Sequence, residues 1–273
     1  GSWFNQVGGP GTTVVNVNGT FTPVVGNFAG SPLDDILWFS PTGTDQLWIN
    51  HDDLTFTKQP LARQLNGAYT PIVGDFAGDD YDDIFWYGPG STQDYLWIGL
   101  TNGLFNQQLQ TVSGSYQPFV VPDATFGGAA TDDIVWYAPG SGGDVLWNFN
   151  TPFGGHATVP LSIAGSPKPV VGDFDGNGYA DVVWYNAGPT SDPYWRGTNG
   201  AGGFTKTSLT VNGTFTPLVE DFTPSGDGFS DILWFGSGTA PDALWQGSAS
   251  GTFARSNQTI THGGRAISLD NDW

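Results

Sequence analysis

The chain alternates short apolar runs with polar turns, and one such pattern recurs five times. Each unit holds a Pro-Val-like run, then an Asp-Ile-x-Trp-aromatic run, then an Asp-x-Leu-Trp-like run. Short runs separated by turns rich in Gly, Asp, Asn and Pro are typical of β-strands. The second run predicts a strand at residues 35–39, 83–87, 133–137, 181–185 and 231–235.

The units repeat at a nearly constant interval. Successive steps of 48, 47, 51 and 48 residues separate Pro23, Pro71, Pro118, Pro169 and Pro217. A period of about 45 residues with four short strands per unit is the signature of a β-propeller. We expect strand A at the proline run, strand B at Asp-Ile-x-Trp, strand C at Asp-x-Leu-Trp, and strand D after it, for example at residues 209–212.

The two ends of the chain each match part of a unit. Residues 3–16 match its second half, and residues 266–272 match strand A and the start of the following loop. The sequence therefore predicts one all-β domain over residues 1–273, a propeller of six blades whose last blade is closed by N- and C-terminal strands. The alternative is five blades, because the sixth unit has no strand B.

Composition and charge exclude several partners. The chain has 26 acidic and 7 basic residues, a net charge of −19 and no cysteine. The absence of a basic surface argues against nucleic acid, and the absence of a long apolar run argues against membrane insertion. The Asp- and Gly-rich, Lys-poor composition favours a secreted or cell-surface protein.

One loop has the spacing of a site for a hard cation. Side-chain oxygens at Asp173, Asp175, Asn177 and Asp181, with the carbonyl of Tyr179, are suited to calcium, and Gly176 and Gly178 allow the backbone to wrap. The alternative is a turn with hydrated carboxylates. A weaker calcium site is expected at Asp75, Asp79 and Asp83, whereas Asp35, Asp83, Asp133 and Asp231 are expected to cap turns where no metal binds.

Two tryptophans and one aspartate recur in every unit. The strand B row is Trp38, Trp86, Trp136, Trp184 and Trp234, and the strand C row is Trp48, Trp97, Trp147, Trp195 and Trp245. Beside the second row lie Asp45, Asp94, Asp144, Asp192 and Asp242. The rings either fill the wedge between blades or stack on sugar rings while the carboxylates bind hydroxyls, and these carboxylates are alternatively turn caps.

The pattern resembles the FG-GAP (VCBS-type) repeats of the integrin α-subunit propeller and of many secreted bacterial proteins. The most specific part of the match runs from Asp173 to Asp181, together with the Asp-Ile-x-Trp-Tyr strands. This resemblance covers nearly the whole chain and implies a propeller whose A–B loops often bind calcium. Related integrin-like propellers include lectins that hold sugars between adjacent blades, and the resemblance implies no enzymatic activity.

Two functions fit these observations. The first is a non-enzymatic carbohydrate-binding module with structural calcium and repeated weak sites between blades, for a glycan or a cell-surface polymer. The second is an extracellular protein-interaction or adhesion module with a protein partner. Enzymatic activity is not expected, because His51, His156 and His262 lie in loop-like contexts without a metal or nucleophile motif.

Overall fold

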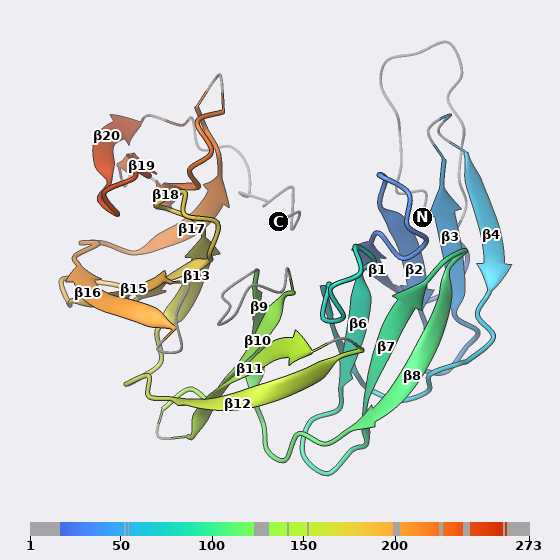
Figure 1. Ribbon diagram of the computed structural model, residues 1–273. Coiled ribbons are helices and arrows are strands. Elements are labelled where there is room, and N and C mark those ends of the chain that lie inside the picture. The colour runs from blue at the N-terminus through green and yellow to red at the C-terminus, as the bar shows by residue number, and fades with distance from the viewer. Residues whose placement is uncertain are drawn as a thin grey trace.

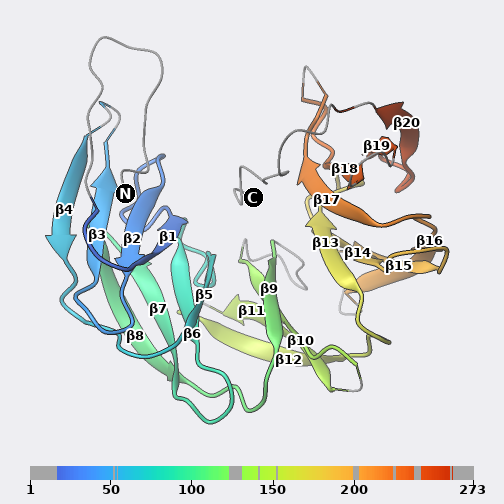
Figure 2. The same cartoon turned by 180° about the vertical axis from the view of Figure 1, so that it is seen from behind.

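The computed structural model describes residues 17–260, apart from positions 52, 54, 123–130, 141, 152, 199–202, 224–225, 237–240 and 259. Within this part, 20 strands form five four-stranded antiparallel sheets whose strand order follows the chain. One repeat of the sequence is therefore one sheet, or blade. The blades follow one another around an arc, and the described strands do not close it into a ring (Figures 1 and 2).

The inner two strands of each blade are those that the sequence predicts. Strand A is β1 (Thr22–Gly26), β5 (Thr70–Gly74), β9 (Gln117–Val121), β13 (Lys168–Gly172) and β17 (Phe215–Glu220). Strand B is β2 (Asp35–Phe39), β6 (Asp83–Tyr87), β10 (Asp133–Tyr137), β14 (Asp181–Tyr185) and β18 (Asp231–Gly236). The segments expected to form a sixth blade, residues 3–16 and 266–272, lie outside the described residues.

The outer two strands complete each blade. Strand C is β3 (Gln46–Asn50), β7 (Asp94–Leu100), β11 (Asp144–Thr151), β15 (Asp192–Gly197) and β19 (Asp242–Gln246). Strand D is β4 (Phe56–Pro60), β8 (Leu104–Gln110), β12 (Gly155–Leu161), β16 (Phe204–Leu209) and β20 (Ala254–Gln258). The prediction of a strand D at residues 209–212 was wrong, because β16 ends at Leu209 and the Val211 N–H donates to Asp192 at 2.7 Å in the following connection.

A proline lies opposite the strand B tryptophan in every blade. The pairs of strands A and B are Pro23–Trp38, Pro71–Trp86, Pro118–Trp136, Pro169–Trp184 and Pro217–Trp234. Proline has no N–H for a ladder, so it is confined to edge strands, and strand A is the inner edge of its sheet. This explains why proline marks the repeat.

The hydrophobic cores lie between blades. Side chains of strand B alternate, so Phe39 faces the second blade while Trp86 of that blade faces back, with ring centroids 4.9 Å apart. The same contact joins Tyr87 to Trp136, Tyr137 to Trp184, and Tyr185 to Trp234 at 5.0–5.2 Å. Each core therefore needs two blades. No helix in the described residues is long and apolar enough to cross a membrane.

Tyrosine hydroxyls fasten the connections between blades. The Tyr185 hydroxyl accepts the Phe215 N–H and donates to the Gly213 carbonyl, each at 2.8 Å. Tyr137 occupies the same place one blade earlier, but its hydroxyl donates to the Gly165 carbonyl at 3.4 Å, and the position of Phe215 is taken there by Pro167, which has no N–H. The Tyr185 hydroxyl therefore bonds two backbone groups, whereas the Tyr137 hydroxyl bonds one.

We predict that Tyr185→Phe lowers the free energy of unfolding by about 1–3 kcal/mol, because it leaves the Phe215 N–H without a partner and removes one of the two hydrogen bonds to the Gly213 carbonyl. Urea unfolding followed by fluorescence measures the change. Tyr137→Phe is the matched control and should cost less than about 1 kcal/mol, since it removes one long hydrogen bond. Equal losses in the two variants would contradict this account.

Candidate functional site

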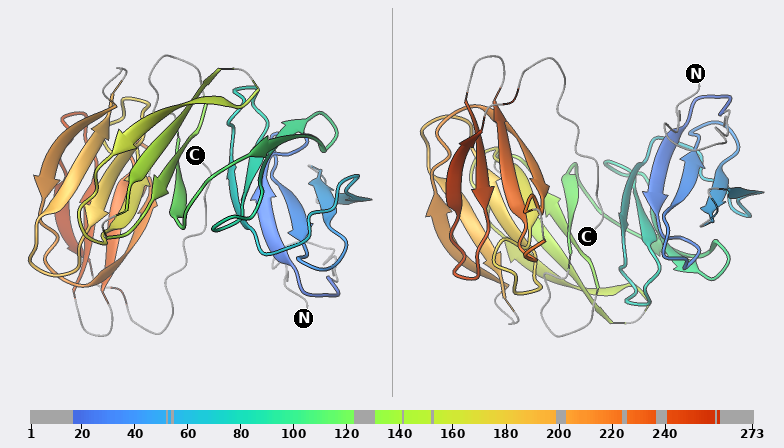
Figure 3. Two further views of the ribbon diagram at one scale, coloured as in Figure 1. Left: turned by 90° about the horizontal axis from the view of Figure 1, so that it is seen from below. Right: turned by 90° about the horizontal axis from the view of Figure 1, so that it is seen from above.

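The antiparallel order places the connections at two opposite ends of the blades (Figure 3). The A–B and C–D connections lie at one end, here the A–B end. The B–C turns and D–A connections lie at the other, here the B–C end. The predicted calcium loops belong to the A–B end and the predicted Asp–Trp pairs to the B–C half, so the two sets of candidate residues are separated along the strands.

The tryptophan side chains of both rows are largely buried in the cores between blades. The strand B tryptophans are at most 7% exposed, and those of strand C at most 5%, except for the half-buried Trp147. Within each blade the two indoles meet edge to face, with centroids 5.1–5.5 Å apart. This placement favours the wedge-filling interpretation, so any sugar contact is limited to the edges of these rings.

The five aspartates at the B–C turns each use both carboxylate oxygens to accept backbone N–H groups. Asp94 illustrates the set: one oxygen accepts the Gly88 N–H and the other accepts the Val112 N–H, both at 2.7 Å. The same two bonds, at 2.7–3.1 Å, are made by Asp45, Asp144, Asp192 and Asp242. All five side chains are buried, which favours the turn-capping alternative over contact with sugar hydroxyls.

A second row of aspartates opens strand B. Asp35, Asp83, Asp133, Asp181 and Asp231 are 0% exposed, and each accepts a backbone N–H from the end of strand C at 2.8–2.9 Å. The predicted capping role of Asp35, Asp83, Asp133 and Asp231 is confirmed. Together the two rows fix both ends of every blade.

The loop of the fourth blade gathers three carboxylates. Oxygens of Asp173, Asp175 and Asp181 lie within 4.8 Å of one another, a grouping that no other described acidic residues make. Gly176 and Gly178 have φ of 67° and 84°, as the predicted wrapping requires. The Oδ1 atom of Asp175 is buried and has no hydrogen-bond partner among the described residues.

The electrostatics of this loop fit a cation. Burial, with the neighbouring Asp173, raises the pKa of Asp175, and burial with the Asp175 charge raises the pKa of Asp181 to about 7. The positive charge of Arg196, whose Nη1 lies 3.5 Å from Asp175 Oδ2, opposes the rise in the pKa of Asp175 in part. Asn177 accepts the Tyr179 N–H at 2.8 Å and donates to the Gly197 carbonyl, so its side chain shapes the loop as well as offering an oxygen.

The loop of the second blade is built differently. Asp75 accepts three backbone N–H groups from Gly78, Asp79 and Asp80, and its oxygens do not converge with those of Asp79 and Asp83 as in the fourth blade. Ala77 stands where the fourth blade has Asp175. A cation there remains a prediction, with fewer converging ligands than at Asp173.

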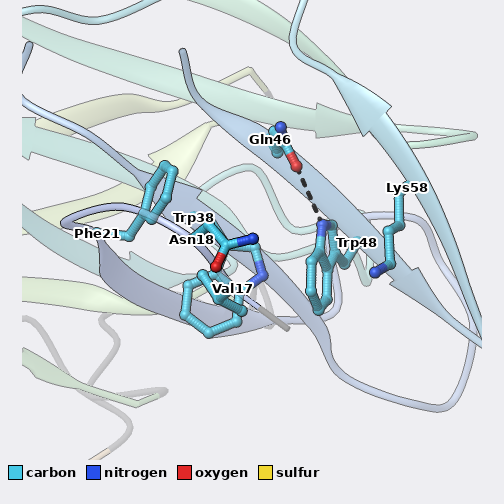
Figure 4. Close-up of a pocket in the computed structure, with 7 residues that line it drawn as sticks. All are labelled: Val17, Asn18, Phe21, Trp38, Gln46, Trp48 and Lys58. Carbon is cyan, nitrogen blue, oxygen red and sulfur yellow. Dashed lines mark hydrogen bonds between the residues drawn. The ribbon is translucent and has the colours of Figure 1, made fainter. Parts of the chain in front are cut away.

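A pocket of about 230 Å³ lies on the first blade, near the B–C end. Phe21, Trp38 and Trp48 form its aromatic walls (Figure 4). Asn18, Gln46 and Lys58 supply its polar groups, and Gln46 accepts the Trp48 indole N–H at 3.4 Å. Val17 completes the lining. Aromatic walls with a few polar groups are the usual composition of a small-molecule site.

The same position is more apolar in the other blades. Where the first blade has Gln46, the others have Tyr95, Val145, Pro193 and Ala243. Asn18, Gln46 and Lys58 were not predicted as ligand-binding residues from the sequence. Gln46 was detectable as the amide at this point of the repeat, whereas Lys58 required the position of strand D, which was predicted incorrectly.

A larger cavity of about 1060 Å³ follows the axis of the arc. Its walls are largely Pro, Val and Gly of the A strands, and its acidic groups, Asp34, Asp82 and Asp132, lie at the A–B end. The Asp82 side chain accepts the Asn27 N–H at 2.5 Å and Asp132 accepts the Asp75 N–H at 3.0 Å, so both link neighbouring blades. The pocket of the first blade is therefore the better candidate for a ligand.

The carboxyl of Asp83 should make stability depend on pH. Its burial raises its pKa from the ordinary 3.8 to about 8, against the opposing effect of the hydrogen bond from Gly99. Between these values the folded chain keeps a proton that the unfolded chain releases. The stabilisation is fully present below pH 3.8 and is lost as the pH rises to about 8.

In chelator, the melting temperature should therefore fall from about pH 6 to about pH 8.5, and Asp83→Asn should flatten this fall because its side chain does not titrate. Thermal melts by circular dichroism measure both slopes. Asp80→Asn, at an exposed neighbour that is not among the groups shifting the pKa of Asp83, should keep the slope of the parent protein. An unchanged slope in Asp83→Asn would refute the assignment.

No family model and no curated protein matches the sequence. Among solved structures, the chain is similar to a lectin of Agrocybe aegerita, whose structure is described as explaining specific recognition of non-reducing terminal N-acetylglucosamine. The TM-score is 0.67 at 18% identity, over 88% of this chain and 66% of the lectin, just under two thirds of its length. This similarity shows that the chain shares the fold of a lectin with repeated four-stranded sheets.

Proposed function

We propose that this chain is a non-enzymatic carbohydrate-binding module whose principal sugar site is the pocket of the first blade. The observation that carries the proposal is the meeting of three aromatic walls with the amides of Asn18 and Gln46 in one pocket. The half-buried Phe21 ring and the exposed edges of the two indoles offer apolar contact to a sugar ring, and amides donate to and accept from hydroxyls. The shared fold with an N-acetylglucosamine-binding lectin supports this choice of ligand class.

The remaining junctions are proposed as weaker sites for the same glycan or cell-surface polymer. They share the paired tryptophans but differ at the position of Gln46, so they are unequal copies. Several weak sites on one rigid arc raise avidity for a repeated ligand. We also propose that residues 3–16 and 266–272 complete a sixth blade, and that the protein acts outside the cell or at its surface, where such ligands are displayed.

Gln46→Ala and Asn18→Ala should each weaken binding of N-acetylglucosamine about fivefold, by removing one hydrogen bond to the sugar. Isothermal titration calorimetry with the free sugar measures the affinity. Asn66→Ala is the matched control, because Asn66 holds the equivalent exposed position in the second blade. Binding that is unaffected in both pocket variants would place the sugar elsewhere.

We propose a structural calcium ion at the loop of the fourth blade. Asp173, Asp175 and Asp181 would hold it, with the Asn177 side chain and the Tyr179 carbonyl as further oxygen ligands, and the ion would neutralise three clustered carboxylates. The buried, unpartnered Oδ1 of Asp175 supports this proposal. Such an ion would tie strand β13 to strand β14.

Calcium at 100 times its Kd should stabilise the fold by about 2.7 kcal/mol, and so raise the melting temperature by roughly 5–10 °C over chelator. Differential scanning calorimetry measures the shift. Asp175→Asn should lose the response, whereas Asp227→Asn, in the loop of the fifth blade, should retain it. A melting temperature indifferent to chelator would exclude a structural ion.

Charge favours protein adhesion as a second candidate. Every described carboxylate that is not buried lies at the A–B end, and of the described Lys and Arg residues only Arg196 and Arg255 lie one residue from that end of their strands. Such an end suits a basic protein partner. Pull-down of one protein that high salt releases, with no sugar bound in calorimetry, would support this function over the first.

A further inference from the structure

Three basic residues occupy one position of the repeat. Lys58, Lys206 and Arg255 lie on strand D, directly opposite the strand C tryptophan of their blade. Each places its cation over that indole, at 3.8 Å from Trp48, 3.8 Å from Trp195 and 3.9 Å from Trp245. Among the described residues, none of the three forms an ion pair, and the one such pair joins Arg196 to Asp175.

None of these three cations pairs with a described carboxylate, although the chain has a net charge of −19. The topology explains how: the described carboxylates at the B–C end are buried and bound to backbone N–H groups, and all others lie at the A–B end. Lys58 is the third of the five residues of β4, so its backbone lies about 7 Å from the start of that strand at the A–B end. The screening length at physiological salt is about 8 Å, so the acidic end opposes an anion near Lys58 only in part.

Lys58 differs from the other two cations because it lines the pocket. Its ammonium has three N–H donors and no hydrogen-bond acceptor among the described residues. The pocket also holds the amides of Asn18 and Gln46. At the position of Gln46, the blades of Lys206 and Arg255 have Pro193 and Ala243, so they offer a cation without that amide.

We propose that the first-blade pocket selects a sugar that carries an anionic group, a carboxylate or a sulfate, and that Lys58 binds this group. The inference rests on the proposed function, since it names the ligand class of the same pocket. A lysine ammonium and an oxyanion form short, charge-assisted hydrogen bonds, which are stronger than those of a neutral hydroxyl. The aromatic walls and amides would hold the sugar ring.

Calorimetry with two matched pairs of sugars tests the proposal. One pair is methyl β-glucuronide and methyl β-glucoside, and the other is N-acetylglucosamine 6-sulfate and N-acetylglucosamine. We expect the anionic member of at least one pair to bind about tenfold more tightly. This preference should shrink between about 0.05 and 0.5 M salt. The pair that shows it identifies the carboxylate or the sulfate.

Lys58→Gln should abolish the preference while binding of the neutral sugar persists, and Lys168→Gln, an equal charge change on an exposed residue of β13, should preserve it. Melting curves of both variants confirm that they are folded. Neutral binding without an anionic preference, or a preference that survives Lys58→Gln, overturns this inference alone. Binding of no sugar to the parent protein overturns the proposed function as well.

Discussion

The contact between the strand B tryptophan of one blade and the aromatic residue of the preceding blade is the interaction on which the rest of the structure depends. An isolated four-stranded sheet would expose both of its apolar faces, and the four junctions between the five described blades cover all but one face of the first blade and one of the fifth. Because large aromatic side chains bury much apolar area, one such pair per junction anchors a whole core. This need is repeated in every unit, so it appears in the sequence as a period.

Buried aspartates complement this contact at the ends of the blades. A turn must leave backbone N–H groups unpaired unless a side chain accepts them, and leaving them buried costs free energy. Ten buried aspartates, two per blade, accept such N–H groups. Much of the acidic composition is therefore architectural. Among the described residues, the carboxylates that remain accessible are at the A–B end, and this leaves the B–C end available for polar or anionic ligands.

The fold was largely predictable because repetition amplifies weak signals. The positions of strands A and B followed from Pro23, Trp38 and their copies, since proline marks an inner edge strand and tryptophan fills a wedge. Strand D was misplaced because its outer position is mostly exposed, so its sequence carries little apolar pattern. The sixth blade remains a proposal, because its segments lie outside the described residues.

The candidate site was less predictable than the fold. Repetition drew attention to Asp94 and its copies, yet residues present in every unit serve needs common to every unit, here the capping of turns. The pocket depends instead on departures from the repeat, such as Gln46 in place of an apolar residue. A departure has meaning only when the strands that surround it are known. The cluster at Asp173 was visible because all of its ligands lie in one short loop.

The indole N–H resonances provide the most direct test that the sugar site is the pocket of the first blade. In ¹⁵N–¹H spectra, addition of N-acetylglucosamine should shift the Trp48 indole signal first, because this N–H donates to Gln46 within the pocket. The signal of Trp97, 1% exposed at the equivalent position of the second blade, should move little. A sugar that binds while the Trp48 signal stays fixed and residues of the A–B end shift would contradict the account.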